Sequence, residues 1–207
     1  TTLLNQLTDK YFDQLYFRQS KQIFDSVNYF INKKFGAIKS ESFINHKILS
    51  LKMVETEAFR LKPEDYATLF SGIKQQLWLH PGFTTIFDKT FTGLLSFDAK
   101  SVKGDEIRKA VNQGDITFLA GHIKTKYKIQ GEMADLVLLK MLHDAYYSGD
   151  FSKTSILQML KSGRFTGHQN KIIRETAINI TEKITHLQLG TTAPAICLNR
   201  FDGTKTC

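Results

Sequence analysis

Apolar residues recur at the spacing of an α-helix along almost the whole of this chain. The clearest case is residues 133–146, where apolar side chains would occupy most of the helix circumference. A helix of that kind belongs at the centre of a bundle. The chain has only three prolines, so few positions would interrupt a helix. We therefore predict an all-α fold, a multi-helix bundle of roughly seven to nine helices with residues 133–146 at its centre.

Capping residues divide the rest of the chain into shorter predicted helices. Ser40, Ser152 and Asn170 are placed as N-caps, and Gly36 and Gly149 as helix ends. Two segments, 96–105 and 124–130, are predicted as loops, the second with a faint strand pattern. The expected helical segments are 3–35 (as one helix or two in line), 40–59, 63–77, 83–95, 105–112, 115–121, 133–146, 152–160 and 170–187.

The first predicted helical region is rich in aromatic side chains, and the net charge of the chain is +8. We expect the aromatic residues to form a core face, although rings between lysines and arginines also suit base stacking. The basic residues stand singly or in pairs, which is typical of a solvated surface. We therefore expect no nucleic-acid site. The aromatic residues are Tyr11, Phe12, Tyr16, Phe17, Phe24, Tyr29 and Phe30.

The titratable residues form no recognisable catalytic or metal-binding motif. His143 and Asp144 are adjacent on the central helix, so their side chains should point about 100° apart and not act as a pair. Glu64 and Asp65 suit the first turn of a helix. The glycines form no phosphate-binding loop. We therefore assign no catalytic, cofactor-binding or metal-ligating residues. The remaining histidines are too dispersed for a helical metal site: His46, His80, His122, His168 and His186.

The last stretch, residues 189–207, breaks the helical pattern. Gly190 ends the preceding helix, and residues 195–198 form an apolar run of strand length. Asp202 and Gly203 are a hairpin-turn dipeptide. No other segment has a clear strand pattern, so we expect the partners of this strand beyond residue 207. The tail is then the start of a second, truncated domain.

The two cysteines, Cys197 and Cys207, both lie in this tail. They are too far apart for a Cys-x-x-Cys pair, and the neighbouring residues offer too few ligands for zinc. We expect Cys197 to be a small buried strand residue and give Cys207 no role. No apolar run approaches the roughly 18 to 20 residues that span a bilayer.

The tail resembles the beginning of TlpA-like and peroxiredoxin-like thioredoxin-fold domains, which read Gly-x-x-Ala-Pro, a short strand and then Asp-Gly. Ile196 stands where that family usually has Phe, and Arg200 where it often has Asp. Residues 133–156 and 170–173 also look like the helical segment that precedes the redox domain in envelope thiol–disulfide oxidoreductases of Gram-negative bacteria. The redox motif Trp-Cys-x-x-Cys is absent, so no redox residue is carried over. The matching tail residues are Gly190, Ala193, Pro194, Leu198, Asp202 and Gly203.

The resemblance implies a helical accessory domain at 1–189 and, at 190–207, a linker with the first strand of a thioredoxin-like domain. Such a domain would be non-catalytic and without a cofactor. It would position the redox domain or bind its protein client, in the periplasm or cell envelope. Two alternatives stay open: a stand-alone helical protein-binding or scaffold domain, and a weak nucleic-acid binder.

Overall fold

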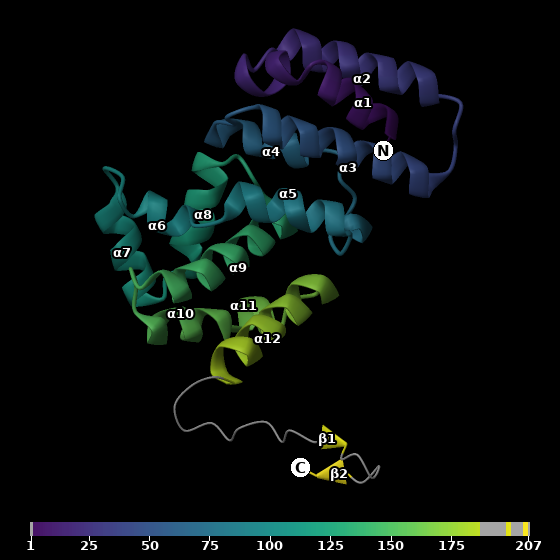
Figure 1. Cartoon of the computed structure of the whole chain (residues 1–207). Helices are drawn as coiled ribbons and strands as arrows, with labels where there is room; N and C mark the ends of the chain where they lie inside the picture. The colour runs from purple at the N-terminus through teal and green to yellow at the C-terminus, as the bar shows by residue number, and fades with distance from the viewer. Residues whose placement is uncertain (1, 187–197, 200–204, 207) are drawn as a thin grey trace.

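The helix α9 (Gly131–Ser148) lies at the centre of the computed structural model, which describes residues 2–186, 198–199 and 205–206 (Figure 1). Helices that contact α9 surround it, and Val137, Leu138 and Leu139 on it are fully buried. The predicted central position of this helix is confirmed. Its neighbours are α5 (Pro81–Phe91), α6 (Leu94–Asp98), α8 (Ile116–Lys126), α10 (Lys153–Leu160) and α12 (Lys171–His186).

The all-α class is confirmed, but the helices are shorter and more numerous than predicted. The described residues form twelve α-helices, together with one π-helical and two 3-10 segments. Gly72, at a φ of 75°, lies between α4 and η3, so the predicted helix 63–77 is divided. The other elements are α1 (Thr2–Lys10), η1 (Asp13–Phe17), α2 (Lys21–Phe35), α3 (Glu41–Ala58), η2 (Pro63–Asp65), α4 (Tyr66–Phe70), η3 (Gln75–Leu77), α7 (Gly104–Gln113) and α11 (Gly163–Thr166).

Side-chain caps hold the helix starts where the sequence indicated them. The hydroxyls of Ser40 and Ser152 accept the main-chain N–H groups of Phe43 and Ser155. Asn170 Oδ1 accepts the N–H of Ile172 at 2.9 Å. Each cap satisfies a donor that the first turn of a helix leaves without a partner. The three predicted N-caps are therefore confirmed.

Both segments predicted as loops contain helix. α6 covers residues 94–98, and α8 continues to Lys126 instead of ending near Gly121. The last turn of α8 is polar because Lys126 points to the carboxylate of Asp98, which is buried on α6. In the sequence, a lysine that bonds a buried carboxylate cannot be told from a lysine in a solvated loop. This is why the end of α8 was predicted as a loop.

The N-terminal helices form a second, smaller core against α3. In Figure 1, α1 and α2 lie on the far side of α3 from the rest of the molecule. Of the aromatic residues predicted to form a core face, Phe24 is buried, but Phe17 is 74 % and Tyr29 68 % exposed. Phe12 and Phe30 are also exposed, so that prediction is wrong for four of the seven residues, whereas Tyr11 and Tyr16 pack against this core. The space is instead filled by Leu4, Leu15, Phe24, Val27, Ile31, Leu51, Val54 and Ala58.

The described part of the tail is a short antiparallel pair of strands. β1 (Leu198–Asn199) pairs with β2 (Lys205–Thr206), with Leu198 opposite Thr206. The expectation that the partner of this strand lies beyond residue 207 is therefore wrong for residues 198–199. Gly190, Ile196, both cysteines and the Asp202–Gly203 turn lie outside the described residues. The domain division at residue 190 stays a prediction.

The central position of α9 predicts a large effect of truncating its apolar side chains. Leu138 is fully buried, so Leu138→Ala should lower the free energy of unfolding by about 2 to 5 kcal/mol. Leu79→Ala is the matched control, because Leu79 is 72 % exposed and should change the value by less than about 0.5 kcal/mol. Urea denaturation followed by circular dichroism gives both values, and equal midpoints would contradict the central placement.

Candidate functional site

A buried carboxylate on α6 is the centre of the most tightly bonded charged cluster. Asp98 is fully buried, and its Oδ2 accepts the hydroxyl of Tyr127 at 2.7 Å and Nε2 of His122 at 2.6 Å. Lys126 Nζ donates to the other oxygen. The ring of Tyr66 stacks on Tyr127 with centroids 5.4 Å apart. The cluster ties the last turns of α8 to α6.

Burial by itself would raise the pKa of Asp98. Hydrogen bonds from His122, Lys126 and Tyr127 outweigh burial, so the pKa of this carboxyl lies below its ordinary value. Burial raises the pKa of Tyr127, and its hydrogen bond to Asp98 adds to the effect. No serine, threonine or cysteine of the described residues is hydrogen-bonded to His122, so the geometry matches a structural cluster better than a nucleophile–base pair.

A second cluster brings His143 and Asp144 together. His143 Nδ1 lies 3.0 Å from Asp144 Oδ1, and Lys140 Nζ donates to the same oxygen at 2.8 Å. The two side chains are therefore in contact, although adjacent helix positions were expected to point them about 100° apart. The reason is that the N–H of Gly93, at 3.0 Å from Oδ2, helps to hold the carboxylate beside the imidazole. Burial raises the pKa of Asp144, but the bonds from His143, Lys140 and Gly93 bring it below the ordinary value.

The other histidines that sequence analysis singled out serve mainly local structure. His80 Nδ1 accepts the N–H of Gly82 at 3.0 Å and caps α5. His168 Nδ1 accepts the N–H of Asn170 at 2.9 Å. Within residues 2–186, no three or more His, Asp or Glu side chains gather in a way that would hold a metal ion. Nor does that part of the chain contain a helix long and apolar enough to cross a bilayer.

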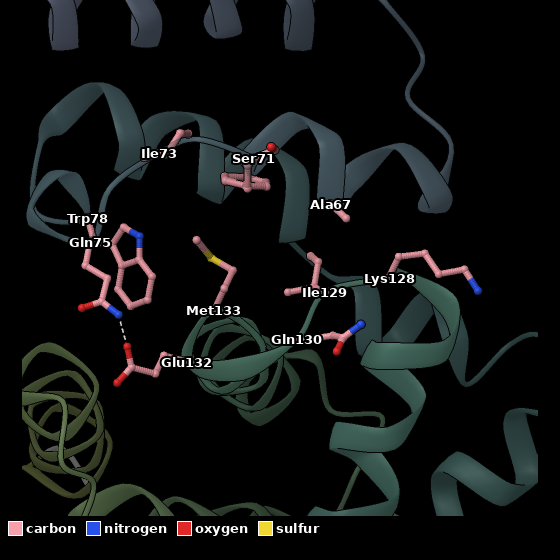
Figure 2. Close-up of a pocket in the computed structure, with 11 residues that line it drawn as sticks. Ala67, Ser71, Ile73, Gln75, Trp78, Lys128, Ile129, Gln130, Glu132 and Met133 are labelled. Atoms are coloured by element: carbon pink, nitrogen blue, oxygen red, sulfur yellow. Dashed lines mark hydrogen bonds between the residues drawn. The ribbon is translucent and has the colours of Figure 1, made fainter.

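A cavity of about 360 Å³ lies on one side of Trp78. Figure 2 shows it between the α4–η3 segment and the segment that leads from α8 into α9. Apolar side chains form its floor, and polar side chains form its rim. The floor residues are Ala67, Phe70, Ile73, Ile129 and Met133, and the rim residues are Ser71, Gln75, Lys128, Gln130 and Glu132.

Trp78 is the wall of this cavity and is held rigidly. Its main-chain N–H donates to the carbonyl of Gln75 at 2.9 Å, and its ring stacks on Phe83. The residue is only 5 % exposed, yet Nε1 of the indole has no hydrogen-bond partner in the described structure. A buried donor without a partner is costly and uncommon in folded proteins. The indole of Trp78 is therefore packed against its neighbours without a hydrogen bond, and its ring forms an apolar wall of the cavity.

The acidic end of the cavity is already bonded. The amide of Gln75 donates to Oε2 of Glu132, and Asn170 Nδ2 donates to the same oxygen at 3.0 Å. These bonds connect η3, α9 and the start of α12. Glu132 therefore fixes the shape of the rim next to Trp78 and leaves a negative charge there.

The opposite rim, residues 128–130, has an irregular main chain. Lys128 has a φ of 59°, in the left-handed region that residues other than glycine rarely adopt. The main-chain N–H groups of residues 128–130 donate no hydrogen bond to any other described residue. Strained backbone of this kind is concentrated at functional sites. Lys128 and Gln130 are exposed, so water can bond their main-chain groups on this side of the cavity.

Sequence analysis did not identify any residue of this cavity as functional. Trp78 is the only tryptophan of the chain and directly precedes the Leu-His-Pro-Gly helix start, which is the one local signal that could have drawn attention to it. Residues 67–75 of the cavity are close to Trp78 in the sequence, but the opposite wall, residues 128–133, is at least 50 positions away. Comparison of the chain with family models, with curated proteins and with solved structures finds no match.

The buried Asp98 cluster predicts a marked loss of stability when the carboxylate is removed. Asp98→Ala should cost about 3 to 5 kcal/mol, because it leaves the partly buried His122 and Lys126 without their partner. Chemical denaturation at neutral pH measures this loss. Asp105→Ala is the control, since the carboxylate of Asp105 is fully exposed. A loss no larger than in the control would contradict the role given to Asp98.

The same cluster predicts a pH dependence. The pKa of Asp98 is lower in the folded than in the unfolded chain, where it is about 3.9. The stability gained from ionised Asp98 is therefore fully present above the unfolded pKa and is lost as the pH falls through the folded pKa. Between about pH 6 and pH 2, the free energy of unfolding should fall less in Asp98→Asn than in the unchanged protein. Urea titrations at each pH measure this free energy. If the free energy of unfolding depends on pH in the same way in both proteins, this prediction is contradicted.

Proposed function

We propose that this chain is a non-catalytic helical domain that binds a protein partner by taking an apolar side chain into the cavity beside Trp78. The observation that carries the proposal is an apolar floor walled by the buried indole of Trp78 and bordered by polar side chains. The cavity volume of about 360 Å³ is within the roughly 300 to 1,000 Å³ typical of ligand sites. A few fixed polar groups around an apolar floor provide orientation and specificity.

The resemblance of the tail suggests the setting of this binding. We propose that the domain accompanies a thioredoxin-like domain in the cell envelope and binds that domain's client protein or positions the domain itself. The support is the Gly-x-x-Ala-Pro and Asp-Gly motif that begins at Gly190. The gene sequence downstream of residue 207 tests this setting, because a Trp-Cys-x-x-Cys motif should follow within some tens of residues. A downstream sequence without it would remove this part of the proposal.

Binding can be tested with a peptide library, because Trp78 is the only tryptophan and its emission can be excited selectively. Octapeptides selected by display against the chain should share one large apolar residue and should shift the emission of Trp78. Ala67→Leu, which narrows the cavity, should weaken their binding at least about tenfold, which corresponds to about 1.4 kcal/mol.

Ala37→Leu is the matched control, because Ala37 is exposed and lies outside the cavity. Thermal denaturation of both variants establishes that they fold. Selected peptides that bind Ala67→Leu as tightly as the unchanged protein would contradict the assignment of the cavity.

The exposed aromatic residues support weak nucleic-acid binding as a second candidate. Tyr29 is exposed, and Lys33 Nζ lies 5.9 Å from the centre of its ring. A base could stack on such a ring while the lysine contacts a phosphate. Because basic residues are dispersed, binding to single-stranded DNA should be weak and should disappear at physiological salt. Fluorescence anisotropy of labelled single-stranded DNA measures this binding. Tight binding at physiological salt that is abolished by Tyr29→Ala would favour the second candidate.

A further inference from the structure

A second cavity, of about 300 Å³, lies in the N-terminal core between α1, α2 and α3. It is distinct from the cavity beside Trp78, because the two share no lining residue. The first turn of α1, the end of α2 and the first half of α3 meet around it (Figure 1). A volume of about 300 Å³ is at the lower limit of the roughly 300 to 1,000 Å³ typical of ligand sites, so a small molecule fits it.

Most of the lining of this second cavity is apolar and comes from all three helices. Leu3 and Leu4 belong to α1, Ile31 and Phe35 to α2, and Phe43 to α3. Leu4 and Ile31 are buried, but the rings of Phe35 and Phe43, with centroids 5.4 Å apart, belong to residues that are only partly buried. Apolar surface is therefore left in contact with water, and its coverage by an apolar group is favourable. The occupant is expected to have an apolar chain.

The polar side of the second cavity carries a positive charge. Lys47 lines the cavity, and its Nζ lies between α3 and α2, where it donates to Oδ1 of Asn32 at 2.8 Å. This amide is neutral, and Lys47 has no ion pair with any of the described residues. An ammonium group has three donors, so two of them stay available to another acceptor.

Acidic side chains do not compensate this charge locally. None of the described residues that line the second cavity is acidic. Glu41, the acid closest in sequence to the α3 wall, accepts hydrogen bonds from Lys74 at 3.3 Å and from Gln76 at 2.9 Å. The last turn of α2 adds two further cations, Lys33 and Lys34. The electrostatic potential at this side of the cavity therefore favours an anion.

We propose that the second cavity binds a free monocarboxylate with an unbranched apolar chain, which is a short fatty acid. The chain lies against Leu3, Ile31 and Phe43, and the carboxylate accepts a hydrogen bond from Lys47 Nζ. This site is separate from the one in the proposed function and does not depend on it. Because the walls belong to three helices, a bound acid holds α1 against α2 and α3 and stabilises the folded N-terminal core.

The first test uses the methyl signals of the full chain in a ¹H–¹³C spectrum, with sodium octanoate as the probe. Octanoate should move the signals of Leu3, Leu4 and Ile31 until they saturate. Ile178 is the control for non-specific contact, because it is exposed on α12 and lies outside the cavity. Cavity signals that stay in place, or that move only together with those of Ile178, would overturn the site.

The role of the cation is tested with Lys47→Met, which removes the charge and keeps an apolar stem. Octanoate should bind about tenfold more weakly, the loss expected for one charge-assisted hydrogen bond. Lys161→Met is the matched control, because it removes the same charge from an exposed residue outside the cavity. Thermal denaturation establishes that both variants fold. Equal affinities of the two variants for octanoate would overturn the contact with Lys47.

The chemical class is tested in the unchanged protein with three further probes, so that it does not depend on any variant. 1-Octanol and octylammonium should both bind more weakly than octanoate. Binding of either as tight as that of octanoate would overturn the recognition of an anion. Acetate, which lacks the chain, should leave the cavity signals in place at the same concentration. Equal movement by acetate would overturn the apolar chain.

Vesicles of phosphatidylglycerol distinguish a free acid from a lipid in a membrane. The protein should stay in the supernatant when the vesicles are sedimented. Sedimentation that Lys47→Met abolishes would overturn the free acid in favour of a membrane surface. Movement of the cavity signals when the protein alone is diluted would overturn it in favour of a second copy of the chain. None of these results bears on the binding of peptides beside Trp78, so this inference and the proposed function can fail separately.

Discussion

Burial of α9 on almost every side is the constraint on which the rest of the fold depends. Because few of its positions face water, the other helices must surround it, and each polar side chain on α9 must find a partner among them. Asp135 accepts two hydrogen bonds from Arg164 of α11, at 2.6 and 2.8 Å. Asp144 accepts the N–H of Gly93, which precedes α6. The polar residues of the central helix thereby determine which neighbours lie against it and in what register.

The buried charge of Asp98 acts in the same way at the periphery. A carboxylate without solvent must be bonded by several donors, and those donors come from the last turns of α8. This requirement fixes the path of residues 122–127. It thereby fixes the point at which the chain leaves α8 and forms the strained segment beside Trp78. The position of the cavity rim is thus a consequence of a structural charge cluster some residues earlier in the chain.

Sequence reasoning succeeded where structure is determined locally and failed where it depends on distant partners. The N-caps at Ser40, Ser152 and Asn170, and the identity of α9, follow from residues within a few positions. The end of α8 and the contact of His143 with Asp144 depend on Asp98 and Gly93, which are distant in sequence. The cavity is hardest to predict, because its walls combine residues 67–78 with residues 128–133.

Two buried polar atoms of the described residues have no hydrogen-bond partner, and one of them, Trp78 Nε1, belongs to a residue of the cavity. Elsewhere, buried acids such as Asp98, Asp135 and Asp144 are fully bonded. Beside Trp78, Glu132 is bonded by Gln75 and Asn170, and both bonds end on Oε2. The indole Nε1 of Trp78 has no partner, and neither has Ser162 Oγ at the start of α11. A buried polar atom without a partner costs stability. The apolar packing around these two atoms must therefore outweigh that cost, because the fold places both of them where no acceptor or donor of the described residues reaches them.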